Sequence, residues 1–131
     1  MGHDFKAFPE LTNSQMRFYY FESPHPQITM GFDARVVSVH DGDSIRVKTD
    51  FRDFDFPIRL LDIQAPELDE EGGRASKDFL RERLEGQDVH VEINPGNRVG
   101  KFGRLLGHIM IMGMNVGVES MQRGYAKRFG T

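Results

Sequence analysis

The sequence contains no cysteine, which excludes a disulfide scaffold, a zinc ribbon and thiol chemistry. It also lacks any apolar run that approaches the roughly 18 residues of a membrane-spanning helix, so we expect no membrane span. The amino terminus, Met1 to Lys6, has neither a basic segment nor an apolar one, and no secretory signal is visible. We therefore expect a cytoplasmic protein, with a virion or host-cell setting left open.

No charge of one sign is in large excess, because 17 basic residues stand against 20 acidic ones and the formal net charge is −3. A protein that coats nucleic acid non-specifically is strongly basic, so this class is excluded. The charge is nevertheless uneven. Residues 62–92 hold ten acidic and four basic side chains, whereas residues 98–131 hold Glu119 against six basic ones (Arg98, Lys101, Arg104, Arg123, Lys127 and Arg128). This distribution suits a cleft with a basic wall and suits ordinary solvated faces equally well.

With 131 residues, the chain has the length of one compact domain. Apolar runs predict five strands, over Ala34–His40, Ser44–Asp50, Pro57–Ile63, Val89–Ile93 and Leu105–Ile111. A helix over Gly73–Leu84 precedes the fourth strand, with an apolar stripe of Ala75, Phe79, Leu80 and Leu84, and a short helix over Val116–Arg123 follows the fifth. Five strands with one helix inserted after the third describe an α+β, mainly β, OB-fold barrel within residues 31–131.

Residues 1–30 differ in composition from the rest, since six aromatic side chains gather there. Thr12 and Gln15 have the spacing of a capping box, which predicts a short helix over about Ser14–Phe21, and Pro24 and Pro26 end it. We expect this segment to be an accessory arm that chemistry does not need. Its aromatic side chains pack on the barrel, join it to a second subunit or dock it on a larger assembly.

Three short segments carry candidate functional side chains. Asp41-Gly42-Asp43 places two carboxylates at a tight turn, as calcium or magnesium requires, although Asp-Gly turns also occur for purely structural reasons. Ile58–Glu67 places Arg59 inside a strand, where its charge needs an anion or an acid nearby, and a purely structural ion pair with Glu67 is the alternative reading. Gly100–Arg104 delivers two basic side chains on a loop, for which a solvated hairpin tip is the alternative reading. Because residues 94–103 contain three glycines and a proline, we expect this loop to be mobile until a phosphate orders it.

In this order and spacing the three segments resemble the staphylococcal nuclease (thermonuclease) family. The likeness extends from about Ala34 to Lys127 and includes the closing run Gly124-Tyr125-Ala126-Lys127. The resemblance implies an OB barrel and an endonuclease, a hydrolase that cleaves phosphodiester bonds of DNA or RNA, preferably single-stranded. It further implies one Ca²⁺ ion as the cofactor and products with 3′-phosphate ends.

The resemblance assigns the catalytic roles to Arg59, Glu67 and Arg104. The two arginines correspond to those that bind the scissile phosphate, and Glu67 corresponds to the acid thought to activate water. The chemistry agrees, because an arginine fork binds two phosphoryl oxygens at once and a carboxylate after a rigid proline is placed to accept a proton from water.

The resemblance also implies a metal site on the neighbouring segments. Asp43 corresponds to a metal carboxylate, Asp41 to an acid just outside the metal's ligands, and Ala65 to a position whose backbone carbonyl binds the metal. Gln64 stands where the family has a second metal carboxylate, so one negative charge is missing and calcium affinity should fall. Asp62 lies two residues earlier, on the same strand face if the pairing is regular, and would then replace the missing charge; the alternative is a surface acid beside a weakened site.

Lys101 and Phe102 are the expected substrate contacts on the loop. Two family tyrosines that touch nucleotide phosphates are replaced, one by Phe102 and the other by Gly130, which removes two hydroxyl hydrogen bonds. A second hypothesis therefore stands beside the active nuclease. In it the chain keeps the barrel but cleaves slowly or not at all, and serves as a nucleic-acid-binding or structural module. Gln64 favours this second reading, and the retained catalytic trio favours the first.

Overall fold

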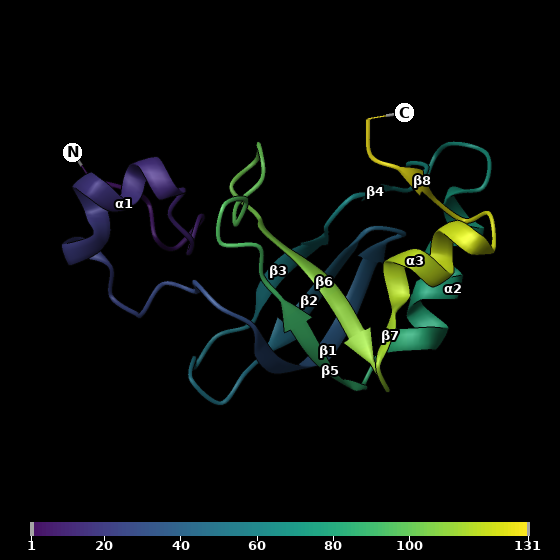
Figure 1. The fold of residues 1–131 in the computed structure, drawn as a ribbon, viewed down its shortest axis with the longest axis horizontal. Coiled ribbons are helices and arrows are strands. Elements are labelled where there is room, and N and C mark those ends of the chain that lie inside the picture. The colour runs from purple at the N-terminus through teal and green to yellow at the C-terminus, as the bar shows by residue number, and fades with distance from the viewer. Residues whose placement is uncertain (1, 131) are drawn as a thin grey trace.

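The computed structural model describes residues 2–130 and has a closed β-barrel at its centre. The barrel strands follow the order β3-β2-β1-β5-β6, and β3 also pairs with β6, which closes the barrel. These strands are β1 (Phe32–Asp41), β2 (Ser44–Lys48), β3 (Phe56–Leu60), β5 (Asp88–Glu92) and β6 (Leu105–Ile111). The expected five-stranded OB-fold barrel of the α+β, mainly β, class is confirmed (Figure 1).

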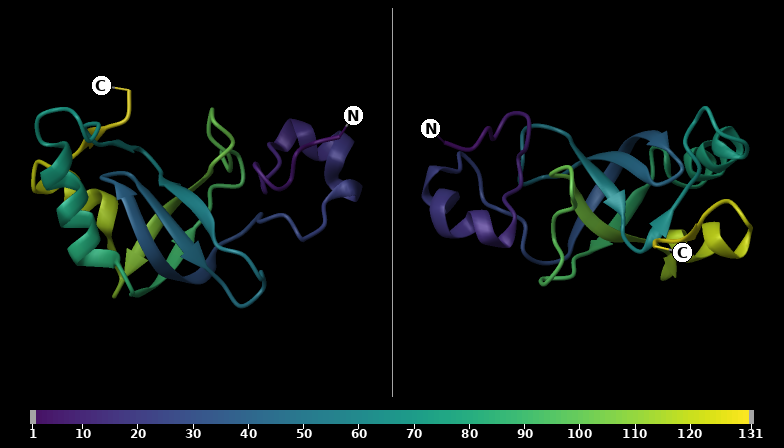
Figure 2. Two further views of the ribbon diagram at one scale, coloured as in Figure 1. Left: turned by 180° about the vertical axis from the view of Figure 1, so that it is seen from behind. Right: turned by 90° about the horizontal axis from the view of Figure 1, so that it is seen from above.

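Two helices lie at one end of the barrel and the amino-terminal arm lies at the other (Figure 2). α2 (Gly73–Leu84) is inserted after the third barrel strand, as expected, and α3 (Val116–Gln122) follows the fifth. A short strand, β7 (Met114–Asn115), pairs with β6. Within residues 2–130, no helix combines the length and apolar character needed to cross a bilayer.

The third expected strand, Pro57–Ile63, is interrupted. β3 ends at Leu60, and Ile63 begins a separate strand, β4 (Ile63–Gln64), which pairs with β8 (Lys127–Arg128) near the carboxyl terminus. The break falls at Asp62, whose φ of +69° is a left-handed conformation that no regular strand contains. The chain therefore turns out of the barrel just before the candidate site residues.

α2 packs on the turn between β1 and β2 through a small polar residue. Ser76 is fully buried, whereas Ala75, which we expected in the apolar stripe, is exposed. A Cβ atom on Gly42 would lie 2.0 Å from Ser76 Oγ, so the turn and the helix meet with no room for a side chain at position 42. The helix is rotated to present its serine to the turn, and this contact supports the backbone between Asp41 and Asp43.

The pairing of β3 on both edges brings the candidate residues together. In the antiparallel β2–β3 pair, Ser44 lies opposite Arg59. In the parallel β3–β6 pair, Arg59 lies opposite Leu106. Asp43 immediately precedes β2 and Arg104 immediately precedes β6. Closure of the barrel thus gathers residues that are about 60 positions apart in the chain at one edge of the sheet.

The arm contains the expected helix, α1 (Asn13–Tyr19), continued by a 3₁₀ turn, η1 (Tyr20–Glu22), and the expected capping box is present at its start. The arm is packed on the rest of the protein, since Leu11 and Ile28 are buried with exposed fractions of 0% and 6%. The division into an arm of residues 1–30 and a barrel of residues 31–131 stays a prediction, and its outermost residues, Met1 and Thr131, lie outside the described residues.

We predict that Gly42→Ala destabilises the protein by about 1–3 kcal/mol, the usual cost of forcing extra volume into a packed site. The new Cβ would meet Ser76 Oγ at 2.0 Å and Ala65 Cβ at 2.6 Å. Denaturant unfolding measures the loss, with Gly96→Ala as the control because its nearest neighbour would lie at 3.6 Å. Equal stability of the two variants would show that the turn is not held by α2.

Candidate active site

Arg59 and Asp43 face each other across the β2–β3 pair. Nη2 of Arg59 lies 3.5 Å from Oδ2 of Asp43, and its Nη1 lies 3.4 Å from the carbonyl oxygen of Leu60. The two side chains are largely buried, with exposed fractions of 16% and 13%. Both guanidinium contacts are long, so most of the five N–H donors remain available to a second anion.

Arg104 reaches the same place from the start of β6. Its Nη1 lies 3.4 Å from the hydroxyl oxygen of Ser44, the residue after Asp43. Its Nε is buried and has no hydrogen-bond partner among residues 2–130. An unpaired buried N–H is costly, and an anion that entered between the arginines would supply the missing acceptor. The guanidinium groups of Arg59 and Arg104 therefore contact adjacent residues, Asp43 and Ser44, and both retain N–H donors without a partner among the described residues.

Asp43 carries a carboxylate that the protein alone does not fully compensate. Oδ2 accepts a hydrogen bond of 2.9 Å from the Ala65 N–H, and the Asp43 N–H donates to Asp41 Oδ1 at 3.1 Å. Burial raises the pKa of the Asp43 carboxyl above its ordinary value, the Ala65 N–H opposes the rise, and the Asp41 carboxylate adds to it. Arg59 lowers the same pKa by a smaller amount. A bound cation would supply the charge that is missing.

The remaining expected residues follow β3 on the segment that turns out of the barrel. Gln64 is exposed and pairs with Lys127 of β8, and Ala65 is buried. Glu67 is exposed, and its backbone N–H donates to Glu70 Oε1 at 2.8 Å. Among residues 2–130, the Glu67 carboxylate makes no hydrogen bond or ion pair, so both oxygens are free to accept a proton from water.

Asp62 does not lie beside Gln64 as regular strand pairing would place it. It occupies the turn before β4, and its Oδ2 lies 3.7 Å from His108 Nε2 on β6. The other ring nitrogen of His108 lies 3.3 Å from Asn115 Nδ2. Asp62 would supply the missing metal charge only if regular strand pairing put it on the same face as Gln64, and the turn at Asp62 breaks that pairing.

The oxygen donors expected for a metal come from Asp43, Gln64 and the Ala65 carbonyl, with Asp41 just outside them. Carboxylate, amide and carbonyl oxygens are ligands that suit a hard cation such as Ca²⁺, and the largely buried Asp43 carboxylate, with Arg59 no nearer than 3.5 Å, fits such an ion. In the part of the chain that the structure describes, no group of three or more His, Cys, Asp or Glu side chains is arranged around one point. Because Gln64 and Ala65 offer neutral oxygens, the expected donor set carries little negative charge.

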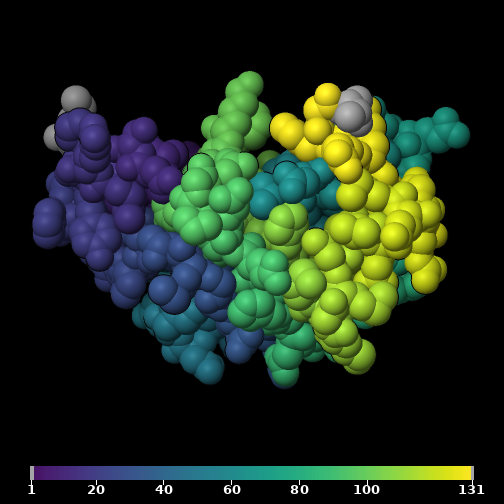
Figure 3. Space-filling view, viewed as in Figure 1, coloured from purple at the N-terminus to yellow at the C-terminus, as the bar shows by residue number. Residues whose placement is uncertain are grey.

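Lys101 and Phe102 lie at the tip of a hairpin that precedes β6. Its two sides are joined by a hydrogen bond of 2.8 Å from the Gly100 N–H to the Arg104 carbonyl oxygen, and Gly103 donates to the Gly100 carbonyl oxygen at 3.0 Å. The hairpin stands out from the surface between the arm and the carboxyl-terminal segment (Figure 3). Phe102 is 68% exposed, and the mobility of the free loop stays a prediction.

Phe129 is a site residue that the sequence did not reveal. Its ring centroid lies 5.0 Å from the guanidinium carbon of Arg59, the distance of a cation–π contact. Its N–H donates to the Asp62 carbonyl oxygen at 2.9 Å, and the β4–β8 pair holds the segment in place. A lone aromatic near the carboxyl terminus gives no local signal of such a contact, because only the long-range strand pairing creates it.

The comparisons with known proteins identify the family. The model of the family described as staphylococcal nuclease homologue matches residues 57–130. The chain belongs to the staphylococcal nuclease family. Two relatives, one from Escherichia coli O157:H7 and one from Escherichia coli, both carry the name "Uncharacterized endonuclease", and each is 34% identical over 102 residues. The matched region is 77% of this chain and only 63% of each relative, so the chain spans less than two thirds of their length.

We predict that Asp43→Asn raises the thermal midpoint at neutral pH in the absence of metal. The folded-state pKa of Asp43 is raised, so folding favours its protonated form and stability is lost as the pH rises through that pKa. The asparagine removes this loss and keeps an oxygen for the Ala65 N–H. Its advantage should disappear below the ordinary carboxyl pKa of 3.8. Thermal denaturation in chelator across this range tests it, with the exposed Asp69→Asn as the control, and a lower midpoint for Asp43→Asn at neutral pH would contradict it.

Proposed function

We propose that this protein is an endonuclease that hydrolyses phosphodiester bonds in DNA or RNA, with one Ca²⁺ ion and 3′-phosphate products. The observation that carries the proposal is the meeting of Arg59 and Arg104 at residues 43–44, with long contacts and an unpaired buried Nε. Membership of the staphylococcal nuclease family supports it, as do relatives named as endonucleases.

In the proposed mechanism, the two arginines bind the scissile phosphate. Each guanidinium offers a planar pair of N–H donors to the phosphoryl oxygens, and this attraction grows as negative charge develops on them in the transition state. The site is largely closed to water at Arg59, whose exposed fraction is 16%, so the attraction is weakly screened. Asp43 orients Arg59, and Ser44 orients Arg104.

Glu67 is the proposed general base. Its carboxylate is exposed and has no competing partner among residues 2–130, so it is able to take a proton from the attacking water. Asp43, Gln64 and the Ala65 carbonyl would hold the Ca²⁺ ion, with Asp41 behind Asp43. The ion, when bound, supplies positive charge to the phosphate oxygens.

We propose single-stranded nucleic acid as the preferred substrate. Two exposed phenylalanines support this, since Phe102 follows Lys101 on the hairpin and Phe129 lies over Arg59, with exposed fractions of 68% and 60%. Unpaired bases stack on exposed aromatic rings, whereas bases inside a duplex cannot reach them. Lys101 adds a positive charge for the backbone beside the rings.

One observation favours a second candidate function, a weakly active or inactive nucleic-acid-binding module. Gln64 leaves Asp43 as the one carboxylate among the proposed metal ligands, so the attraction of the site for calcium is weaker. The arginine pair does not depend on Gln64, and phosphate binding would persist without cleavage.

We predict that Arg59→Ala, Arg104→Ala and Glu67→Gln each lower the cleavage rate of denatured DNA by about 100-fold or more, because each removes a charge or a base that acts in the transition state. The measurement is the initial rate with calcium and with chelator, and end-labelling of the products identifies the phosphate position. Arg74→Ala and Glu82→Gln, both at exposed positions of α2, are the matched controls. Parent-like cleavage by Glu67→Gln would exclude it as the base, and binding of DNA without cleavage by the parent would favour the second candidate.

We predict that Gln64→Asp lowers the calcium concentration needed for half-maximal activity, because it returns a carboxylate to the donor set. Calorimetric titration with calcium measures the affinity directly. Gln87→Asp adds the same charge at an exposed position away from the site and should leave the affinity unchanged. Equal calcium affinity of parent and Gln64→Asp would remove position 64 from the metal site.

A further inference from the structure

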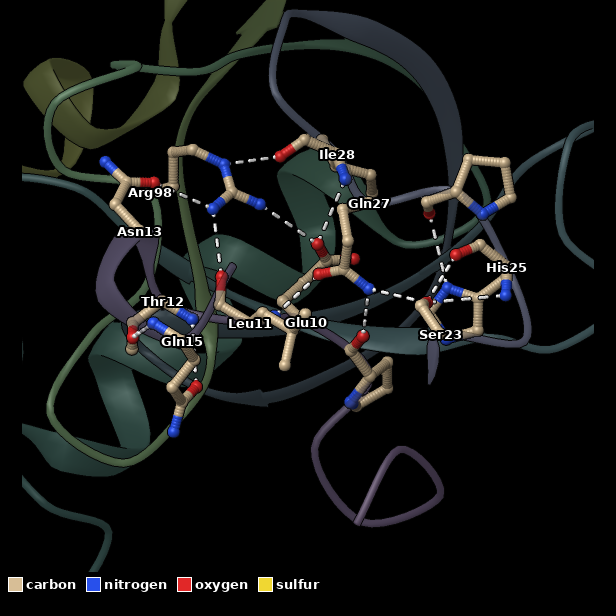
Figure 4. A network of polar contacts seen from close by, with 12 residues as sticks. Glu10, Leu11, Thr12, Asn13, Gln15, Ser23, His25, Gln27, Ile28 and Arg98 are labelled. Atoms are coloured by element: carbon tan, nitrogen blue, oxygen red, sulfur yellow. Dashed lines mark hydrogen bonds and ion pairs between the residues drawn. The ribbon is translucent and has the colours of Figure 1, made fainter. Parts of the chain in front are cut away.

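Arg98 connects the amino-terminal arm to the hairpin that carries Arg104. Its side chain is buried, and among residues 2–130 its hydrogen-bond and ion-pair partners all belong to the arm (Figure 4). The guanidinium donates to the carbonyl oxygens of Ile28 at 2.6 Å and Leu11 at 2.9 Å, and to Asn13 Oδ1 at 3.0 Å. Arg98 therefore adds no charge to the basic wall that the sequence suggested, and it ties the hairpin to the arm.

A buried carboxylate from the arm balances this charge. Glu10 is 3% exposed, its Oε2 lies 3.3 Å from Arg98 Nη2, and its other oxygen accepts from the fully buried Arg52 of the β2–β3 connection. Burial lowers the pKa of the Arg98 guanidinium, and Glu10 opposes this shift. A buried charge that loses its partner is strongly destabilising. If the hairpin separated from the arm, the Arg98 guanidinium would either become exposed to solvent or stay buried without its carboxylate partner.

The backbone carries this constraint from Arg98 to Arg104. The Arg98 carbonyl oxygen accepts from the Leu106 N–H at 2.8 Å, Val99 bridges Leu105, and the Gly100 N–H donates to Arg104 at 2.8 Å. Arg98 and Arg104 thus lie on the two facing sides of one hairpin. A displacement of the first side moves the second side with it.

The arm also touches the hairpin at two further points. Asn13 Nδ2 donates to the Pro95 carbonyl oxygen at 2.9 Å, where the loop begins. Phe8 packs against Gly103, since a Cβ atom on that glycine would lie 2.8 Å from Phe8 Cδ1. Gly103 directly precedes Arg104. The arm therefore supports the loop at its start, along its first side and at its tip.

From these contacts we infer that the arm positions the active site: Phe8, Asn13 and Glu10 hold the hairpin so that Arg104 meets the phosphate beside Ser44. The inference rests on the proposed function and replaces the expectation that the arm is dispensable for chemistry. These are positioning residues, because each acts through Arg104. A displacement of the order of 1 Å in a group that stabilises the transition state can cost about 100-fold in rate.

The test compares arm variants in the full-length protein. We expect Phe8→Ala, and the double variant with Asn13→Ala, to lower kcat by about 10- to 100-fold with a smaller change in KM. Phe8→Tyr should restore the rate, because Phe8 is 45% exposed and a ring with a hydroxyl still covers Gly103. Phe18→Ala and Phe21→Ala are matched controls on the same arm, with exposed fractions of 76% and 97%. A parent-like kcat for both arm variants would overturn the inference.

A double-mutant cycle separates positioning from general stability. In an Arg104→Ala background the Phe8 and Asn13 substitutions should have no further effect on kcat, because the group through which they act is gone. A loss of the same size in that background would mean that the arm acts only by stabilising the fold, and would overturn the inference.

Amide hydrogen exchange tests the same link without catalysis. Exchange at Gly100 and Gly103, whose N–H groups are bonded within the hairpin, should be faster in Phe8→Ala and parent-like in Phe21→Ala. Unchanged exchange would overturn the inference even if the protein is a nuclease. A parent protein that cleaves nothing would instead refute the proposed function. Calorimetric binding of a nucleoside 3′,5′-bisphosphate then replaces kcat, and the arm variants must weaken it in the parent and not in the Arg104→Ala background.

Discussion

The hydrogen bonds that β3 makes along both of its edges are the constraint on which the site depends. In an open sheet, β3 would pair only with β2, so Arg59 would lie beside Ser44 and the other edge of β3 would have no neighbouring strand. Because β3 also pairs with β6, the start of β6 is brought to the same place, and Arg104 comes with it. Each contact within the site is long and individually weak. The barrel, rather than those contacts, keeps two like-charged guanidinium groups near one another.

A second constraint acts on the hairpin from outside the barrel. Glu10 is the only acid among the described residues that pairs with both Arg52 and Arg98, so one buried carboxylate joins the arm, the β2–β3 connection and the hairpin. Such an ionic cluster gives little net stability, because desolvation offsets the attraction. It does fix geometry, since the fork of Arg98 has its donors matched to two carbonyl oxygens and two side chains. The arm thus contacts the hairpin that precedes β6, and the barrel places the start of β6 beside β3.

Local sequence predicted the elements better than the contacts between them. Four of the five strand runs, the bounds of α2 and the capping box of α1 each follow from neighbouring residues and appear, whereas the third strand run breaks at Asp62. That a strand arginine needs an acid nearby also followed from chemistry, but the sequence pointed to Glu67 as its partner, whereas the structure places Asp43 there. Ser76 in place of Ala75, the burial of Arg98 and the position of Phe129 did not follow. Each depends on a partner more than 30 positions away, which neither periodicity nor spacing reports.

The replacement at Gln64 affects the two halves of the proposed site differently. Phosphate binding, as proposed, uses the two arginines, which β3 and β6 place next to residues 43 and 44, and none of these contacts involves Gln64. Calcium binding, as proposed, uses Asp43, where burial raises the carboxyl pKa by more than Arg59 lowers it. An amide oxygen at position 64 removes repulsion among the metal ligands as well as attraction for the metal, so Asp43 carries more of the charge that draws the ion. In the proposed enzyme, glutamine at position 64 therefore raises the calcium concentration that activity requires, and the two arginines that bind the phosphate keep their positions.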